Sequence, residues 1–174
     1  GGPARSFLSS LAGDERIFAA DIAVDRAHVV MLAEQRIIEE DDAGAILSAL
    51  AEIADAGHSA LPDGEDVHEA IEAAVIDRVG PDGGRMHTAR SRNDEVATCI
   101  RYRLREDVRG SLSALIGLRG VLLEAAQAHT ETVMPGYTQL QSAQPTTVAH
   151  WLLSYEAAVE RDTERLLSAY ERIN

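Results

Sequence analysis

Residue types suited to binding an anion are concentrated in residues 85–94, which read Arg-Met-His-Thr-Ala-Arg-Ser-Arg-Asn-Asp. Each arginine presents a fork of N–H donors that can pair with a carboxylate through two parallel hydrogen bonds. A long helix is expected to start here, and the N–H groups of a helix N-terminus also favour anions. The segment is therefore a candidate carboxylate site. In the alternative interpretation, Ser91, Asn93 and Asp94 only cap the helix and the arginines lie on the surface.

A second polar segment occupies residues 133–145 and reads Val-Met-Pro-Gly-Tyr-Thr-Gln-Leu-Gln-Ser-Ala-Gln-Pro. Its glutamine, tyrosine and hydroxyl side chains can hydrogen-bond a polar ligand without adding charge. The alternative is an ordinary polar loop between two helices, and composition alone does not separate the two.

These two segments, together with Asp66-Val67-His68, closely resemble the argininosuccinate lyases of the fumarase/aspartase superfamily and their delta crystallin relatives. Residues 87–94 match the stretch His-Thr-(Gly/Ala)-Arg-Ser-Arg-Asn-Asp of that family. Residues 135–145 match its stretch Pro-Gly-Tyr-Thr-His-Leu-Gln-x-Ala-Gln-Pro with one change, and residues 149–151 also agree. The resemblance extends over nearly all 174 residues.

The resemblance implies a reversible β-elimination that splits argininosuccinate into arginine and fumarate, the last step of arginine biosynthesis, with no metal or organic cofactor. It also implies a homotetramer in which three subunits contribute to each active site. The loop that carries the base serine in this family lies beyond Asn174, as do the rest of the central domain and the C-terminal domain. Residues 1–174 alone are therefore expected to be inactive.

The resemblance also assigns roles to individual residues. Ser91, Arg92 and Asn93 are expected to bind the substrate, and Thr138 to bind a succinyl carboxylate from another subunit. His68 is expected to lie near the site. The groups expected to shape the loops are His87, Gln141 and Gln144.

Two positions depart from the pattern of the family. Gln139 stands where the family has its proposed general acid, a histidine, and losing such an acid could cost roughly 10²–10⁴ in rate. His87 or His68 could substitute, or Gln139 could orient a water. Asp21 stands where the family has a substrate-binding serine, and it would face an anionic substrate unless it pairs with the guanidinium of that substrate.

Two other functions compete with this one. A non-catalytic structural homologue, in the manner of the delta crystallins, is favoured by Gln139 and Asp21. A sibling fumarate-releasing lyase, such as adenylosuccinate lyase, is opposed by the run Arg90-Ser91-Arg92-Asn93.

Apolar periodicity predicts an all-α fold. Helices are expected at residues 22–38, then from the acidic cluster at residues 39–42, which supplies N-caps, to the stop at Gly57, and then at residues 66–79. These three helices form a small N-terminal domain, residues 1–82. No segment alternates long enough to predict a strand.

The rest of the chain, residues 83–174, is expected to begin a central bundle of long helices. One helix spans about residues 94–130, and another begins near Val148 and is still amphipathic at Ile173. Because a loop of about a dozen residues joins them, the two helices should form an antiparallel pair. A pair cannot cover its apolar stripes, so further helices or other copies of the chain should cover them.

Composition excludes several classes of protein. The chain carries 29 acidic and 16 basic side chains, every base is arginine, and the net charge is −13. Such a charge disfavours electrostatic binding of nucleic acid, and no apolar run approaches the ~20 residues that cross a membrane. The start, Gly1-Gly2-Pro3, has no signal pattern, so a cytoplasmic location is expected. The acidic, lysine-free composition indicates salt adaptation or a GC-rich genome.

Overall fold

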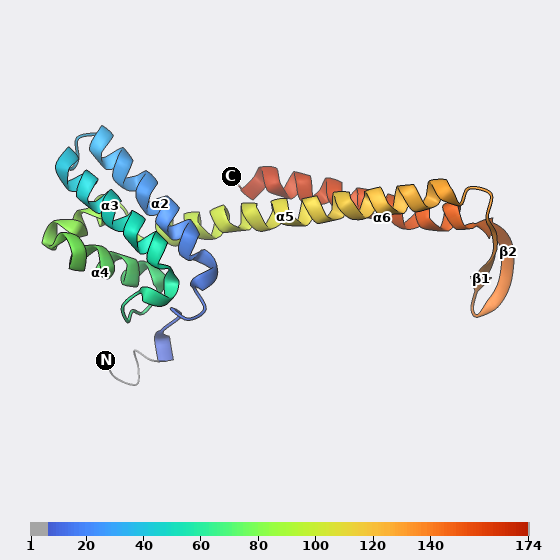
Figure 1. The fold of residues 1–174 in the computed structure, drawn as a ribbon, viewed down its shortest axis with the longest axis horizontal. Coiled ribbons are helices and arrows are strands. Elements are labelled where there is room, and N and C mark those ends of the chain that lie inside the picture. Colours follow the sequence, from blue (N-terminus) through green and yellow to red (C-terminus); the bar gives the residue numbers. More distant parts are fainter. Residues whose placement is uncertain (1–6, 174) are drawn as a thin grey trace. The chain divides into compact units, whose positions relative to one another are not determined.

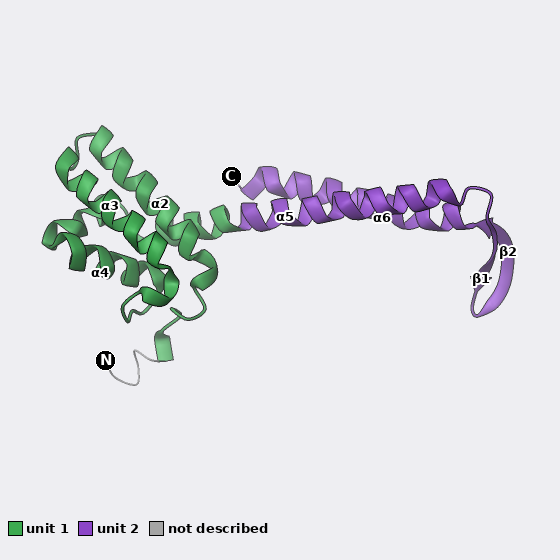
Figure 2. Cartoon of the chain, viewed as in Figure 1, with its two compact units in different colours: residues 1–103 green, residues 104–174 purple. Residues whose placement is uncertain are grey.

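The computed structural model describes residues 7–173 and divides the chain into two compact units, residues 1–103 and 104–174 (Figure 2). Helices make up 75% of it, which confirms the all-α class, and only a small two-stranded sheet interrupts them. The sequence expectation about residues 1–3 lies outside the described residues. No described helix has a stretch long and apolar enough to cross a membrane.

Unit 1, residues 1–103, is built on the helices α2 (Glu15–Glu34), α3 (Glu40–Ala56) and α4 (Val67–Val79) (Figure 1). The short 3₁₀ helices η1 (His58–Ala60) and η2 (Pro81–His87) follow α3 and α4. The three α-helices pack their apolar faces into one core, which η2 closes with Met86. The largest fully buried aliphatic side chains of this core are Leu32, Ile46, Leu50, Ile53 and Ile71.

Local sequence explains where α4 begins and where α3 and α4 end. The Asp66 side chain caps α4 by accepting the N–H of Glu69 at 2.7 Å. Gly57 and Gly80 follow α3 and α4 with φ of 82° and 88°, values that glycine adopts without steric cost. The predictions for both helices are therefore confirmed to within a residue or two. The acidic cluster lies in the first turn of α3, but its N-cap, Glu39, makes no side-chain capping bond.

The first predicted helix is displaced. It was expected at residues 22–38, but α2 begins at Glu15 and ends at Glu34. Arg36, with φ of 57°, turns the chain out of the helix without any glycine to mark the end. The stretch from Glu15 to Ile22 includes Ile17 and Phe18, which pack against the core, and Phe18 lies one helical turn before Ile22, so the earlier start was visible in the sequence.

Unit 2, residues 104–174, confirms the predicted antiparallel pair. Helix α5 spans Arg92–Ala128 and α6 spans Val148–Ile173, and residues 104–128 of α5 lie beside α6 (Figure 1). Arg119 Nε donates to Glu156 at 2.7 Å, and Arg119 Nη2 donates to Glu160 at 2.7 Å. The Arg105 guanidinium lies 4.4 Å from the centre of the Tyr170 ring. Large apolar side chains of both helices remain exposed, among them Ile116, Val121, Leu123, Leu153 and Leu167.

The prediction that residues 133–145 form a loop without strands is wrong. Strands β1 (Val133–Thr138) and β2 (Gln141–Thr147) pair as an antiparallel hairpin, with Thr138 opposite Gln141. The two turn residues, Gln139 and Leu140, have φ of 49° and 62°, as a tight primed hairpin turn requires. Sequence reasoning missed the hairpin because its strands have no buried face, so no alternation of apolar residues signals them.

Candidate functional site

The N-terminus of α5 begins with a reciprocal capping arrangement. The Ser91 hydroxyl accepts the N–H of Asn93 at 3.3 Å, while the Ser91 N–H donates to the Asp94 carboxylate at 2.8 Å. The capping that the sequence offered as an alternative is therefore present. Ser91 and Asn93 nevertheless remain exposed, so both side chains are accessible to a ligand.

Arg90 is buried, which contradicts the interpretation that the arginines of this segment lie on the surface. Its side chain is 3% exposed, and Nη2 lies 2.5 Å from Asp25 Oδ1 and 3.2 Å from Glu95 Oε1. Two residues earlier in the chain, the Thr88 carbonyl accepts a hydrogen bond from His28 Nε2 at 2.8 Å. Both partners, Asp25 and His28, lie on α2. Residues 88–90 are therefore held against α2.

Arg92 is half-buried and bound within the chain. Its Nη1 donates to both carboxylate oxygens of Asp66, at 2.6 and 2.8 Å. Nε lies 3.7 Å from Glu95. Arg92 thus joins the start of α5 to the cap of α4, and any substrate carboxylate at this guanidinium would share it with Asp66. Arg85, about half exposed, pairs with Asp82 at 3.0 Å.

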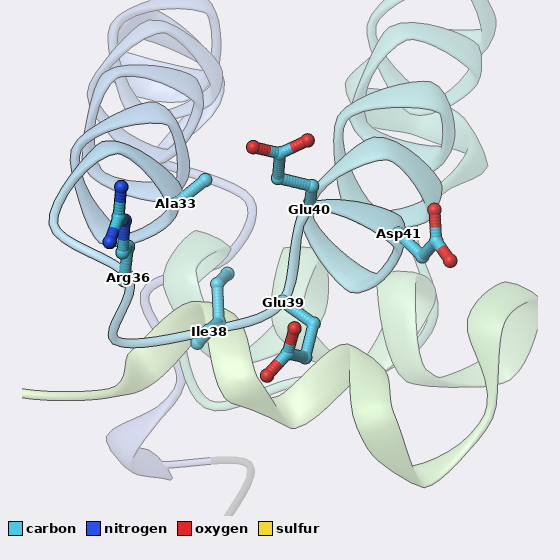
Figure 3. A pocket seen from close by; sticks show the side chains of 6 residues that line it. All are labelled: Ala33, Arg36, Ile38, Glu39, Glu40 and Asp41. Atoms are coloured by element: carbon cyan, nitrogen blue, oxygen red, sulfur yellow. The ribbon is translucent and has the colours of Figure 1, made fainter.

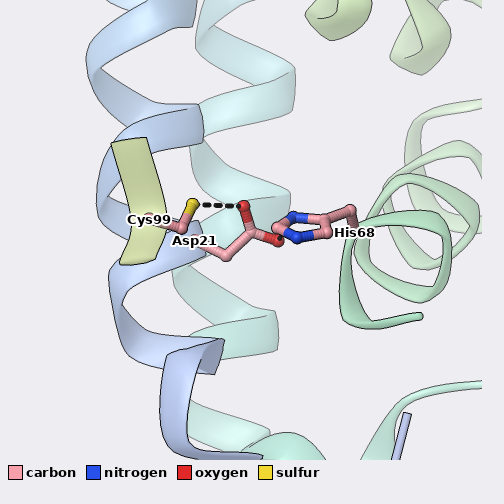
Figure 4. A group of neighbouring side chains, drawn as sticks. All are labelled: Asp21, His68 and Cys99. Carbon is pink, nitrogen blue, oxygen red and sulfur yellow. Dashed lines mark hydrogen bonds and ion pairs between the residues drawn. The ribbon is translucent and has the colours of Figure 1, made fainter. Parts of the chain in front are cut away.

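Asp21 contacts side chains from two other helices, His68 on α4 and Cys99 on α5 (Figure 4). The Asp21 side chain, on α2, is fully buried, and its Oδ2 lies 2.8 Å from Nδ1 of His68, on α4. Its Oδ1 accepts a hydrogen bond from the thiol of Cys99, on α5, at 3.1 Å. Cys99 is a free cysteine and is buried. Asp21 and His68 are therefore in contact, whereas sequence reasoning treated them as two separate substrate-facing groups.

The buried charges shift one another's protonation. Burial lowers the pKa of His68, but contacts with the Asp21 and Glu95 carboxylates outweigh it and raise that pKa to about 10. Burial and the neighbouring Asp21 charge raise the pKa of Asp25 to about 7, against the opposing effect of Arg90. Burial also raises the pKa of the Cys99 thiol. For Glu95, contacts with His68 and Arg90 outweigh burial and lower the pKa. His68 is therefore an imidazolium at neutral pH.

Two groups of buried side chains in the described part of the chain bring ligand-type atoms within 4.8 Å of one another: Asp21, His68 and Cys99, and Asp21, Asp25 and Glu95. Neither suits a metal ion. In the first group, the two Asp21 oxygens already contact His68 Nδ1 and the Cys99 thiol. The guanidinium of Arg90 already contacts Asp25 and Glu95. The cluster is an ion-pair network that joins α2, α4 and the start of α5.

Thr138 and Gln139 lie at the tip of the hairpin in unit 2, both exposed, next to Leu140, which is 99% exposed. Gln141 begins β2 and Gln144 lies within it, and both are exposed. His87, half-buried in unit 1, has its Nδ1 3.8 Å from Glu95.

An open cavity of about 460 Å³ lies between the end of α2 and the start of α3 and is lined by acidic side chains (Figure 3). In this view the carboxylates of Glu39, Glu40 and Asp41 point in different directions, and Arg36 faces the same space. They do not converge on a common point, so this cavity is not the better candidate site.

A cavity of about 410 Å³ between α2 and the start of α5 is the better candidate, because Arg90, Asp94 and Glu95 line it. The same cavity is bordered by His28 and Thr98 and by apolar side chains of α2 such as Met31. It places the polar start of α5 beside an apolar wall, which is the usual composition of a site for a small organic molecule.

Comparisons with known proteins find similarity to lyases. A family profile described as "Lyase" matches residues 6–174. The argininosuccinate lyase of Haloarcula marismortui is 73% identical over 174 residues, 100% of this chain and 35% of the relative. The argininosuccinate lyase of Natronomonas pharaonis is 71% identical over all of this chain and 36% of its own length. The chain thus spans about a third of the curated relatives that it matches.

Solved structures share the fold. An EDDS lyase variant with bound fumarate has a TM-score of 0.85 at 32% identity, over 99% of this chain and 35% of that chain. A fumarate lyase from Mesorhizobium has a TM-score of 0.77 at 20% identity, over 97% of this chain and 40% of that chain.

Proposed function

Because this chain belongs to the lyase family, we propose that the complete protein splits argininosuccinate into arginine and fumarate by a reversible β-elimination. The observation that carries the proposal is the 73% identity to the argininosuccinate lyase of Haloarcula marismortui, which extends over every residue of this chain. Since the chain covers 35% of that relative, the proposal concerns the complete protein.

The reaction needs hydrogen-bond donors where negative charge develops. A base removes a proton from the carbon next to a carboxylate, charge moves into that carboxylate, and the C–N bond breaks as the guanidine nitrogen is protonated. Fixed donors aimed at the developing charge supply much of such catalysis. We assign this role to the exposed side chains of Ser91 and Asn93, with Arg92 beside them, and the binding of a succinyl carboxylate to Thr138 at the hairpin tip. The base serine would come from beyond residue 174.

The remaining role to assign is that of the general acid. Gln139 lies at the exposed hairpin tip where a histidine is expected, and an amide has no proton to give near neutral pH. His68 is a poor substitute because its imidazolium is buried and contacts Asp21 and Glu95. The other candidate histidine, the half-buried His87, is more exposed than His68. Asp21 is the least supported of the proposed substrate residues, since its two oxygens contact His68 and Cys99.

The proposal extends to assembly and setting. A homotetramer with shared sites would cover the apolar side chains that α5 and α6 leave exposed within unit 2. A salt-adapted cytoplasmic enzyme fits the charge of −13 and the relatives from halophilic archaea.

The test is to supply the complete protein with argininosuccinate and follow fumarate by its ultraviolet absorbance, with adenylosuccinate as the comparison substrate. Turnover of argininosuccinate alone supports the proposal. Turnover of adenylosuccinate alone points to the sibling lyase, and a folded protein that turns over neither is a non-catalytic homologue; both outcomes contradict it.

A matched experiment uses residues 1–174 alone. We expect no release of fumarate from argininosuccinate, because the base serine is missing. Steady growth of fumarate absorbance with this polypeptide would contradict the expectation.

A further inference from the structure

We propose that Arg90 and His28 are positioning residues that hold residues 88–93 on helix α2, and thereby place the donors of Ser91 and Asn93. The inference rests on the proposed function and deepens it, because it assigns a positioning role to two residues to which the proposed function gives none. Residues 88–93 are called the donor segment below.

The backbone of the donor segment is strained at one point. Ala89 has φ of 60°, in the left-handed region that disfavours residues with a Cβ atom. Such a conformation is disfavoured and persists only where the surrounding structure holds it. Ala89 lies between η2, which ends at His87, and α5, which begins at Arg92, so the turn there sets the direction in which α5 starts.

Two contacts hold this turn, one on each side of Ala89. The Thr88 carbonyl accepts from His28 Nε2 at 2.8 Å, and Arg90 Nη2 lies 2.5 Å from Asp25 Oδ1. Asp25 and His28 are three residues apart on α2 and therefore share a face of that helix. Both contacts thus fix the donor segment to one rigid element.

The contact between Arg90 and Asp25 is buried, so water cannot replace either partner. The side chains of Arg90 and Asp25 are 3% and 1% exposed, so neither can exchange its partner for water. Without Arg90 the buried Asp25 carboxylate takes up a proton instead of remaining charged, and the contact that ties the donor segment to α2 at this point is lost. Because Ser91 is exposed, no core packing holds the segment between Arg90 and the contact of Arg92 with Asp66. Loss of Arg90 should therefore displace Ser91 and Asn93.

A purely structural role makes a different kinetic prediction. If Arg90 only stabilised unit 1, its loss would reduce the amount of active enzyme and lower apparent kcat with KM unchanged. If it positions the donors, KM for argininosuccinate should rise, because the carboxylate is held less well before any bond breaks.

The experiment compares Arg90→Met, His28→Leu and Arg90→Lys in the complete protein. We expect Arg90→Met to lower kcat/KM about 10- to 100-fold, mainly through a higher KM, because small displacements of binding groups have effects of that size. His28→Leu should act in the same direction but less. Arg90→Lys keeps the charge and should recover part of the loss in KM.

Two controls separate positioning from stability. Leu50→Val removes a methylene from the fully buried core of unit 1 and lowers Tm without touching the donor segment. Arg78→Met removes an arginine that pairs with Glu52 at 3.5 Å on α3. Neither should raise KM. An Arg90→Met variant whose KM is unchanged, or a Leu50→Val variant whose KM rises equally, would overturn the inference.

Amide hydrogen exchange gives a readout that does not depend on turnover. Exchange at residues 89–94 should accelerate in Arg90→Met and stay unchanged in Arg78→Met, and unchanged exchange in Arg90→Met also overturns the inference. If the wild-type protein releases no fumarate, the proposed function fails, while the exchange data still decide whether Arg90 holds the segment.

Discussion

The structural role of Asp21 follows from the side chains that it contacts. On the sequence alone it is an anion placed where a substrate anion is expected. In the fold its carboxylate lies 2.8 Å from the His68 ring and accepts from the Cys99 thiol. Arg90 contacts Asp25 and Glu95 in the same cluster. Each buried carboxylate therefore has a cationic neighbour, which is the condition under which buried charges are tolerated.

This network makes stability depend on pH. The pKa of His68 is about 10 in the folded chain and 6.5 without its partners, so its contribution is complete below about pH 6.5 and is lost as pH rises through 10. We expect Tm of the complete protein to fall over that range. His68→Gln should lower Tm at pH 7, since breaking a buried ion pair costs roughly 3–5 kcal/mol, and its Tm should approach the wild-type value near pH 10.

The control for this measurement is His129→Gln, because His129 is an exposed histidine of unit 2. It should leave the pH profile unchanged. Parallel pH profiles for the wild type and His68→Gln would show that the pKa of His68 is not raised.

Gln139 is the residue whose replacement should help. If its position carries the general acid, Gln139→His in the complete protein should raise kcat by roughly 10²-fold or more. Gln141→His, on the same hairpin, should leave kcat unchanged because Gln141 is not at the acid position. Equal kcat for the wild type and Gln139→His would place the acid elsewhere.

Among the elements, the helices were largely predictable and the hairpin was not. Helices α3 and α4 end at Gly57 and Gly80, whose sequence signals are local, and the long apolar repeats of α5 and α6 specify their extent. The hairpin depends on backbone pairing around a turn of Gln139 and Leu140, which is not a typical turn sequence. Its geometry nevertheless decides where Thr138 and Gln139 are presented.

Gly136 tests whether the hairpin matters for activity. A Cβ atom at this position would lie 2.7 Å from the Gln144 carbonyl oxygen on the opposite strand, closer than real Cβ contacts. Gly136→Ala should therefore accelerate amide exchange across residues 133–147 and lower kcat/KM about tenfold or more, because it displaces Thr138.

The matched control is Gly110→Ala in α5, where an added Cβ meets nothing within 4 Å. It should raise stability by up to ~1 kcal/mol, as alanine does in a helix, without changing kcat/KM. Unchanged exchange and unchanged kinetics in Gly136→Ala would mean that the hairpin tolerates the contact and that its shape is not needed.

For the whole molecule, charge is the dominant property. A net charge of −13 in a chain of 174 residues favours self-repulsion in dilute buffer. Residues 85–109, by contrast, contain seven arginines and only four acidic residues. The fold uses Arg90 and Arg92 of this group in ion pairs with acids of unit 1, so part of the local positive charge serves the structure rather than a ligand.

Salt should therefore stabilise the protein. The screening length falls from about 10 Å at 0.1 M to about 3 Å at 1 M salt, and we expect Tm of the complete protein to rise over that range of KCl. Sucrose at equal osmolality stabilises by exclusion from the surface and leaves repulsion in place, so its effect should be smaller. A Tm that is insensitive to KCl would favour the alternative in which the composition reflects a GC-rich genome.

The sequence by itself determined the all-α class, the ends of α3 and α4, the antiparallel pair and the family, because these depend on periodicity, capping residues and short motifs, all of which are local. Only the tertiary structure decided that Arg90 is buried against Asp25 and that Asp21 contacts His68. The partners in each pair are separated by more than 40 residues in the chain, so no local pattern could reveal them, and burial is what turns their proximity into a constraint.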